Sequence, residues 1–204
     1  MTRRAEVGIL ALQGDFAEHA AALQRQGLGT RLVRRPADLA GLSGLVLPGG
    51  ESTTMLRLLQ AQGLEQPLTE LLAAQRVPVL ATCAGLILLA RKVSRPEQRS
   101  FGVLDVDVER NAYGPQIASG VFPLHGDGVP PGTTGVFIRA PRVVRAGPDV
   151  EVLARRDGDP VLVRDRAILG ACFHPELDAD HPVTRSFVAM VRGAAVEQGS
   201  LLAG

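Results

Sequence analysis

Residues 79–89, VLATCAGLILL, decide the fold and raise the main question about function. The run 79–81 predicts a buried strand and the run 86–92 a helix, so Cys83 lies at a strand-to-helix turn. The small residues around it suit the sharp bend of a nucleophile elbow, and the N–H groups that open a helix favour a reactive thiolate. Free cysteines are also among the most buried residue types, so this stretch alone leaves a core role equally open.

The first half of the chain alternates short aliphatic runs with longer amphipathic ones. The aliphatic runs predict buried strands at 7–12, 30–34, 44–48 and 77–81. The amphipathic segments predict helices at 17–27, 53–62 and 68–75. Such β-α-β alternation predicts an α/β fold in three layers, with a mostly parallel central sheet and flanking helices on both faces. No internal repeat or linker appears, and residues 1–204 are expected to form a single domain.

The second half is richer in extended segments. These are expected at 101–110, 134–141, 150–155, 160–165 and 167–173. Asp157 and Gly158 carry the Asp-Gly signal of a hairpin. A final amphipathic segment, 181–195, predicts a helix with Pro182 in its first turn.

Charge and composition exclude several classes of partner. Lys and Arg number 22 against 21 Asp and Glu, and no long run of like charge points to nucleic acid or an anionic membrane. The longest apolar window, 77–90, is too short and too interrupted to span a bilayer. The two cysteines and the lack of a secretory start favour a cytoplasmic protein with reduced thiols.

A cysteine nucleophile needs a base, and the chain has four histidines. His19 falls in a helical run, where a surface or half-buried position is expected. His125 is expected in a solvated loop, and His181, just before a helix start, is expected to cap that helix or to be exposed. His174 differs because it ends a buried strand, and functional sites collect at the carboxyl ends of parallel strands.

His174 also has a candidate orienting partner two residues away. Pro175 biases His174 towards an extended conformation, in which residues two apart point the same way. Glu176 can then hold the imidazole in the tautomer that accepts a proton from sulfur. An ordinary loop with an unrelated carboxylate is the alternative.

The same atoms allow two other uses. Cys83, Cys172 and His174 offer zinc-ligand chemistry, but no CxxC or paired-His spacing supports it, and no metal is expected. Cys172 alternates faces with Phe173 and could approach Cys83 as a redox pair. Packing is the role expected of Cys172.

The segment LPGGESTT, 47–54, is a second strand-to-helix junction. Its paired glycines let a ligand approach the backbone, and Ser52 is placed to cap a helix from Thr53. It lacks the lysine of a P-loop and the spacing of GxGxxG. An oxyanion hole fits better, with one N–H from this loop and one from Ala84.

Three motifs in this order, LPGGEST (47–53), TCAGLI (82–87) and FHPEL (173–177), resemble those of the class I, triad-type glutamine amidotransferases, which have a flavodoxin-like fold. GILALQGDFAEH (8–19), VERNAYG (108–114) and GVFIRAP (135–141) narrow the resemblance to the glutaminase subunits of pyridoxal 5'-phosphate synthases. The resemblance extends over residues 7–191. Two positions depart from it: Ala81 stands where the elbow usually begins with glycine, and Pro115 where an arginine is common.

The resemblance implies a role for each matching residue. Cys83 would be the nucleophile, His174 the general base and acid, and Glu176 its orienting partner. The backbone N–H groups of Gly50 and Ala84 would form the oxyanion hole. L-Glutamine would be bound by Gly50, Glu51, Ser52, Arg110, Ile138 and Arg139, and a guanidinium suits an α-carboxylate.

The implied reaction is hydrolysis of L-glutamine to glutamate and ammonia through a cysteine thioester, without a cofactor. The implied partner is the synthase (lyase) subunit, in a hetero-oligomer that makes pyridoxal 5'-phosphate (vitamin B6). Docking of this subunit is implied to activate the glutaminase. Two competing functions remain open. They are a triad amidotransferase that feeds a different synthase, and a non-catalytic regulator or thiol redox sensor with the same fold.

Overall fold

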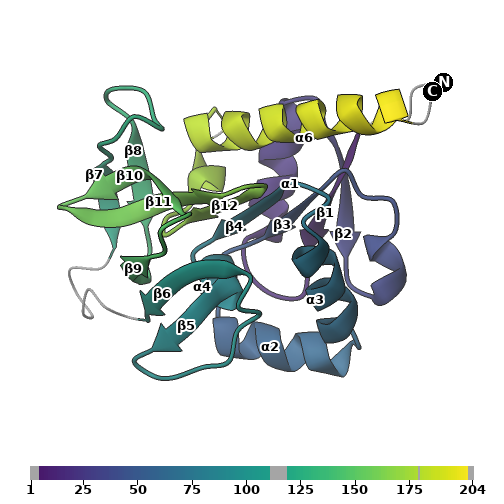
Figure 1. The fold of residues 1–204 in the computed structure, drawn as a ribbon, viewed down its shortest axis with the longest axis horizontal. Coiled ribbons are helices and arrows are strands. Elements are labelled where there is room, and N and C mark those ends of the chain that lie inside the picture. The colour runs from purple at the N-terminus through teal and green to yellow at the C-terminus, as the bar shows by residue number, and fades with distance from the viewer. Residues whose placement is uncertain (1–4, 111–118, 179, 202–204) are drawn as a thin grey trace.

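A seven-stranded sheet forms the centre of the molecule in the computed structural model, which describes residues 5–110, 119–178 and 180–201 (Figure 1). The strand order is β10-β11-β12-β4-β3-β1-β2. The strands are β1 (Glu6–Leu10), β2 (Gly29–Val33), β3 (Gly44–Leu47), β4 (Val79–Thr82), β10 (Glu151–Arg156), β11 (Asp159–Asp165) and β12 (Ile168–Ala171). The five strands from β12 to β2 are parallel, and β10 and β11 add antiparallel pairs at one edge. This confirms the mostly parallel sheet that the alternating pattern predicts.

Helices cover both faces of this sheet, which confirms the three layers. They are α1 (Phe16–Arg25), α2 (Ser52–Ala61), α3 (Glu65–Ala74), α4 (Ala84–Leu89) and α6 (Pro182–Leu201), with short 3-10 turns η1 (Pro36–Leu39) and η2 (Pro175–Leu177). α1 and α6 lie on one face, and α2 and α3 lie on the other (Figure 1). All residues of β3, β4 and β12 are buried, as their continuous apolar sequences require of strands covered on two faces.

The prediction of a helix over 86–92 is wrong for the second half of that range. α4 ends at Leu89, and Ala90 begins β5 (Ala90–Ser94), in which Arg91 and Lys92 are exposed. β5 pairs with β6 (Leu104–Glu109), which pairs with β9 (Arg142–Ala146) in a small three-stranded sheet. Pairing with β6 satisfies the backbone of this segment outside the helix, and local helical periodicity carries no information about such a partner.

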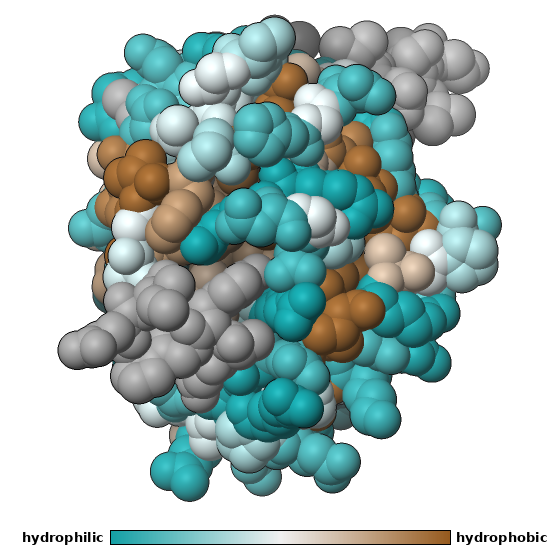
Figure 2. All heavy atoms as spheres, turned by 90° about the vertical axis from the view of Figure 1, so that its left-hand side faces the viewer, coloured by the Kyte–Doolittle hydropathy of each residue, from teal (hydrophilic) through white to brown (hydrophobic). Residues whose placement is uncertain are grey.

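A further small sheet, β7 (Gly120–Pro123) with β8 (Thr134–Phe137), was not predicted as a pair. The hairpin at Asp157 and Gly158 is present, with φ of 50° and 87° between β10 and β11. The side of the molecule that carries the small sheets shows apolar patches among hydrophilic side chains (Figure 2). None of the helices in the described ranges combines the length and the apolar character that crossing a membrane requires.

The topology brings three chain segments to one edge of the sheet. β3, β4 and β12 are parallel neighbours, so their carboxyl ends meet there. The segments that leave these ends begin at Pro48, Cys83 and Cys172. The loop after β1 starts at the same edge, because β1 is parallel to β3. Such an edge is where open α/β sheets place their ligands.

Candidate active site

Cys83 occupies a strained turn between β4 and α4. Its φ of 47° and ψ of −103° lie where few non-glycine residues are found, and strain of this kind clusters at functional positions. The turn is held by the Cys83 N–H, which donates to the carbonyl of Ala171 at 2.8 Å. A side chain at Gly85 would collide with the backbone of Leu47, which explains the glycine two residues after the cysteine. Ala81 lies within β4 at negative φ, so the methyl group there is tolerated.

His174 and Glu176 form a buried pair where the chain leaves β12. His174 Nδ1 lies 2.8 Å from Glu176 Oε1, and the two residues are 4% and 2% exposed. Burial lowers the pKa of His174, but hydrogen bonds to Cys83 and Glu176, together with their charges, raise this pKa to about 10. The structure therefore brings together the three residues that the sequence nominated as a triad.

The loop that follows β3 packs closely on the loop that follows β1. The Glu51 N–H donates to Gln13 Oε1 at 2.7 Å, and the Asp15 N–H donates to the Gly49 carbonyl at 3.3 Å. Gly50 has a φ of 149°, which disfavours any residue with a side chain. In this arrangement the carbonyl of the peptide that joins Gly49 and Gly50 points towards the Asp15 N–H.

The helix cap expected at Ser52 is wrong. α2 begins at Ser52, and Glu51 caps it by accepting hydrogen bonds from the N–H groups of Thr53 and Thr54 at 3.1 and 2.6 Å. The Ser52 hydroxyl instead donates to Gln98 Oε1 at 2.9 Å. Burial raises the pKa of Glu51, but the hydrogen bonds from Thr54 and Thr53 prevail and lower it to about 2. Glu51 is therefore an anion at neutral pH.

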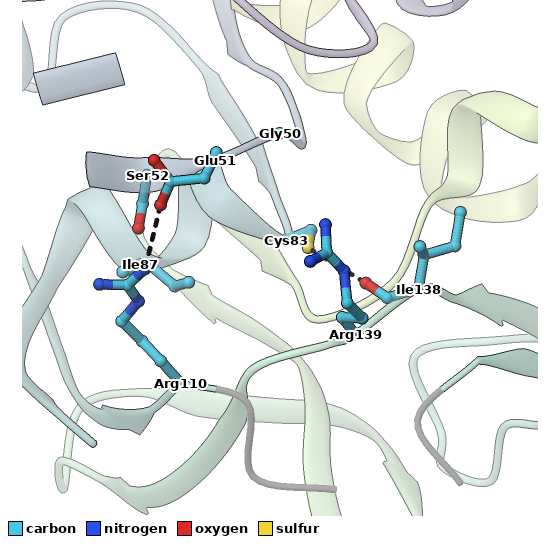
Figure 3. Close-up of a pocket in the computed structure, with 8 residues that line it drawn as sticks. All are labelled: Gly50, Glu51, Ser52, Cys83, Ile87, Arg110, Ile138 and Arg139. Atoms are coloured by element: carbon cyan, nitrogen blue, oxygen red, sulfur yellow. Dashed lines mark hydrogen bonds and ion pairs between the residues drawn. The ribbon is translucent and has the colours of Figure 1, made fainter. Parts of the chain in front are cut away.

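A cavity of about 220 Å³ opens beside the thiol (Figure 3). The residues that line it are Gly50, Glu51, Ser52, Cys83, Ile87, Arg110, Ile138 and Arg139. All six residues nominated for L-glutamine are among them. Ala84 opens α4 directly after the thiol, so its backbone N–H belongs to the same turn.

The two arginines of the cavity differ in how firmly their guanidinium groups are held. Arg110 donates to Glu51 Oε1 at 3.0 Å, to Thr53 Oγ1 at 3.2 Å and to Gln98 Oε1 at 2.7 Å, so most of its guanidinium is already bonded. Arg139, at a φ of 44°, extends its guanidinium towards Cys83, and no ion pair holds it within the described ranges (Figure 3). The cavity thus holds one carboxylate and two guanidinium groups.

Sequence reasoning missed several polar residues around the site. Asp15 Oδ2 lies 3.3 Å from His174 Nδ1, although an N-cap aspartate would ordinarily bond its own helix. Gln98 accepts hydrogen bonds from Ser52, Thr53 and Arg110. Gln13 and Asp15 could have been found, because they follow a parallel strand at its carboxyl end. Gln98 lies in a loop with no such signal.

For the other three histidines, the structure confirms some of the expected positions and corrects others. His125 is exposed, as expected. His181 caps α6 through Nδ1, which accepts from the Val183 N–H at 3.2 Å, but the ring is buried rather than exposed. His19 is only 2% exposed, so the expected surface or half-buried position is wrong.

Cys172 is fully buried, and burial raises the pKa of its thiol, which fits the packing role. Within the described ranges, one group of side chains has ligand atoms close enough for a metal ion, and it consists of Asp15, His174 and Glu176. It contains neither cysteine, so the alternative of a zinc site built on Cys83, Cys172 and His174 gains no support. Pro115 and the end of the VERNAYG segment lie outside the described residues.

Comparison with known proteins gives the family. The family model for the SNO glutamine amidotransferases matches residues 9–193. The pyridoxal 5'-phosphate synthase subunit PdxT of Thermotoga neapolitana is 46% identical, covering 92% of this chain and 100% of the relative. The subunit of the same name from Mycobacteroides abscessus is 50% identical over 91% of this chain and 97% of its own.

Solved structures agree with this assignment. A crystal structure of a glutamine amidotransferase superposes with a TM-score of 0.84 at 45% identity, covering 91% of this chain and 98% of that one. A protein from Thermoplasma acidophilum described as part of a putative GMP synthase, at 17% identity and a TM-score of 0.69 over the full length of both chains, shares the fold. The chain belongs to the SNO glutamine amidotransferase family.

Proposed function

We propose that this chain, acting as one glutamine amidotransferase domain, hydrolyses L-glutamine to glutamate and ammonia on Cys83. It supplies the ammonia to a synthase subunit that makes pyridoxal 5'-phosphate. The observation that carries the proposal is a thiol held at a strained elbow beside a cavity with both signs of charge, together with the buried His174–Glu176 pair, whose imidazole pKa Cys83 helps to raise. The names of the relatives support the identity of the partner. The proposed compartment is the cytoplasm, where thiols stay reduced.

The first half of the reaction forms the thioester. The thiol proton passes to His174, and the sulfur attacks the carboxamide carbon of glutamine. The carbonyl oxygen becomes an oxyanion, which the N–H groups of Gly50 and Ala84 would stabilise. His174 then gives its proton to the leaving nitrogen, the C–N bond breaks, and ammonia departs. Before the attack, the hydrogen bonds and charges of Cys83 and Glu176 raise the pKa of His174 to about 10, which favours transfer of the thiol proton to the imidazole.

The second half releases glutamate. A water molecule attacks the thioester carbon while His174 takes one of its protons. The C–S bond then breaks, and the proton returns to the sulfur. Glu176 remains ionised throughout. Its carboxylate accepts the hydrogen bond from His174 Nδ1, which orients the ring and stabilises the imidazolium.

The cavity suits a free amino acid. L-Glutamine has an α-ammonium and an α-carboxylate, which match the charges of Glu51 and the two arginines. Glu51 and Arg110 can remain paired with each other, and each can still form a further hydrogen bond with the substrate.

Replacing Arg110 with glutamine is expected to raise KM for glutamine about tenfold, because a charge-assisted hydrogen bond contributes roughly 1.5–3 kcal/mol. kcat should change less, since Arg110 does not touch the reacting atoms. Steady-state ammonia release measures both constants. R164Q is the matched control, because Arg164 pairs with Glu151 at 2.6 Å outside the cavity. An unchanged KM in R110Q would remove Arg110 from the binding site.

Activity is expected to depend on the partner. The Gly49–Gly50 peptide accepts a hydrogen bond through its carbonyl from Asp15, and a glycine pair can reverse that orientation at little steric cost. Docking of the synthase subunit would then complete the oxyanion hole.

We therefore expect weak ammonia release from the isolated chain and a clear increase when the synthase subunit is added. Titrating the purified synthase into a fixed amount of this chain, with saturating glutamine, measures the effect. Equal rates at every ratio would rule out partner gating, and absence of activity at every ratio would rule out the proposed function.

A further inference from the structure

His19 is a buried histidine that the proposed mechanism does not use. It lies in α1, where the other buried side chains are the apolar Ala22 and Leu23. Its imidazole is 2% exposed and faces the core side of the helix. A polar ring in this position needs partners to offset the loss of water.

Both partners of His19 belong to the active site. Its Nε2 lies 3.1 Å from Thr82 Oγ1, on the residue that precedes Cys83. The same nitrogen lies 3.4 Å from Glu176 Oε2. His19 therefore bridges the end of β4, which carries the nucleophile, and the turn that carries the orienting carboxylate.

The Glu176 carboxylate needs such a partner. Oε1 is engaged by His174 Nδ1 at 2.8 Å, whereas Oε2 is buried and accepts no hydrogen bond from the described residues. A buried carboxylate oxygen without a donor is costly, and His19 Nε2 lies within ion-pair distance of it. Catalytic hydrogen bonds are often long in unliganded structures and shorten when substrate binds.

The charge state of His19 fits the role of a neutral donor. Burial lowers the pKa of His19, while Glu176, Asp15 and Glu18 oppose that effect and His174 adds to it. A neutral ring that carries its proton on Nε2 can donate to the carboxylate without adding a cation beside His174. The negative charge of Glu176 then remains available to the catalytic imidazole.

We propose that His19 is a positioning residue of the active site, which holds Glu176 through Oε2 so that Oε1 stays on His174 Nδ1. The inference rests on the proposed function, because it assumes that Glu176 orients a catalytic His174. His19 itself does not line the cavity, so its influence falls on turnover rather than on glutamine binding.

Three variants, each assayed as the complex with the synthase subunit, test this role. H19L removes the donor at similar bulk and is expected to lower kcat about tenfold or more, with KM nearly unchanged. H19Q keeps an amide N–H donor near the position of Nε2 and is expected to retain most of kcat. H19N keeps polarity but falls short of Glu176, so it should behave like H19L and serves in its place if H19L does not fold.

The pH profile separates positioning from mere structural support. The groups that face His19 are Glu176 and His174 from the turn after β12, Asp15 and Glu18 from its own helix segment, and the uncharged Thr82 from β4. Without its donor, Glu176 protonates at higher pH, so the acid limb of kcat/KM should move to higher pH in H19L and not in H19Q. A structural defect alone would lower the fraction of active enzyme equally at every pH.

H181Q is the matched control, because His181 is also buried and its Nε2 lies 2.9 Å from the Thr134 carbonyl. It should change thermal stability and leave the pH profile in place. Wild-type kcat and pH profile in both H19L and H19N would overturn the inference while leaving the proposed function intact. If the wild-type complex itself releases no ammonia from glutamine, the proposed function fails instead.

Discussion

Replacing Cys83 with alanine is expected to lower glutamine-dependent ammonia release by roughly 10⁴-fold or more, the scale on which loss of a nucleophile acts. The sulfur is the only heavy atom removed, so the cavity keeps its shape and its charged groups. The oxyanion donors and His174 would remain, but no thioester can form. Ammonia release should be measured with saturating glutamine and excess synthase subunit, so that partner gating does not limit the rate.

The geometry of Cys83 makes this variant a clean test. Alanine has the same Cβ and bears the same strain at a φ of 47°, so the elbow is kept. C172A is the control, since Cys172 is the second buried cysteine and has no catalytic role in the proposal. It should lose some thermal stability through the cavity left behind and keep its kcat. Full turnover in C83A would reject the nucleophile assignment.

Substitution of Gly49 by alanine is expected to lower kcat about a hundredfold, since misplacing a catalytic group by about 1 Å has an effect of that size. The added Cβ would collide with Cε1 of the His174 ring and lie 3.0 Å from both Nδ1 and Asp15 Oδ2. The ring must move, which disturbs its 2.8 Å contact with Glu176 and its contact with the thiol. Gly49 does not need positive φ, so backbone strain is not the cause.

G193A is the matched control for this glycine. A Cβ at Gly193, which lies in α6, meets no neighbouring atom within 4 Å among the described residues, and alanine favours a helix by up to about 1 kcal/mol over glycine. Its kcat should equal that of the wild type. Both variants should still bind the synthase subunit, which co-elution of the two proteins would measure. A wild-type kcat in G49A would show that His174 has more freedom than its packing indicates.

The sequence predicts the central sheet well because the strands are buried on both faces. Continuous apolar runs such as 77–81 identify themselves without knowledge of their neighbours. The pattern fails where pairing is decided far along the chain. Ala90 leaves the helix to pair with Leu104, and a local helical pattern does not contain that partner.

The site likewise contains residues that the local sequence predicts and residues whose position depends on distant partners. Cys83 and His174 are predictable because each follows a buried strand, and parallel strands place their carboxyl ends together. The burial of His19 is not predictable in this way, because a single polar residue on a helix is typical of a solvent-exposed position. Its burial depends on Thr82 and Glu176, which lie 63 and 157 positions further along the chain and reach it only in the folded protein.

The order of strands in the sheet has a consequence for how the protein is made. β4 lies between β3 and β12, and β12, at Ile168–Ala171, leaves the ribosome after most of the chain. Until then one edge of β4 is unpaired, and the residue that holds the Cys83 N–H, Ala171, does not yet exist in the growing chain. His174 and Glu176 arrive only a few residues later. Unfinished chains therefore carry Cys83 without the His174–Glu176 pair, and under the proposed function such chains could not hydrolyse glutamine.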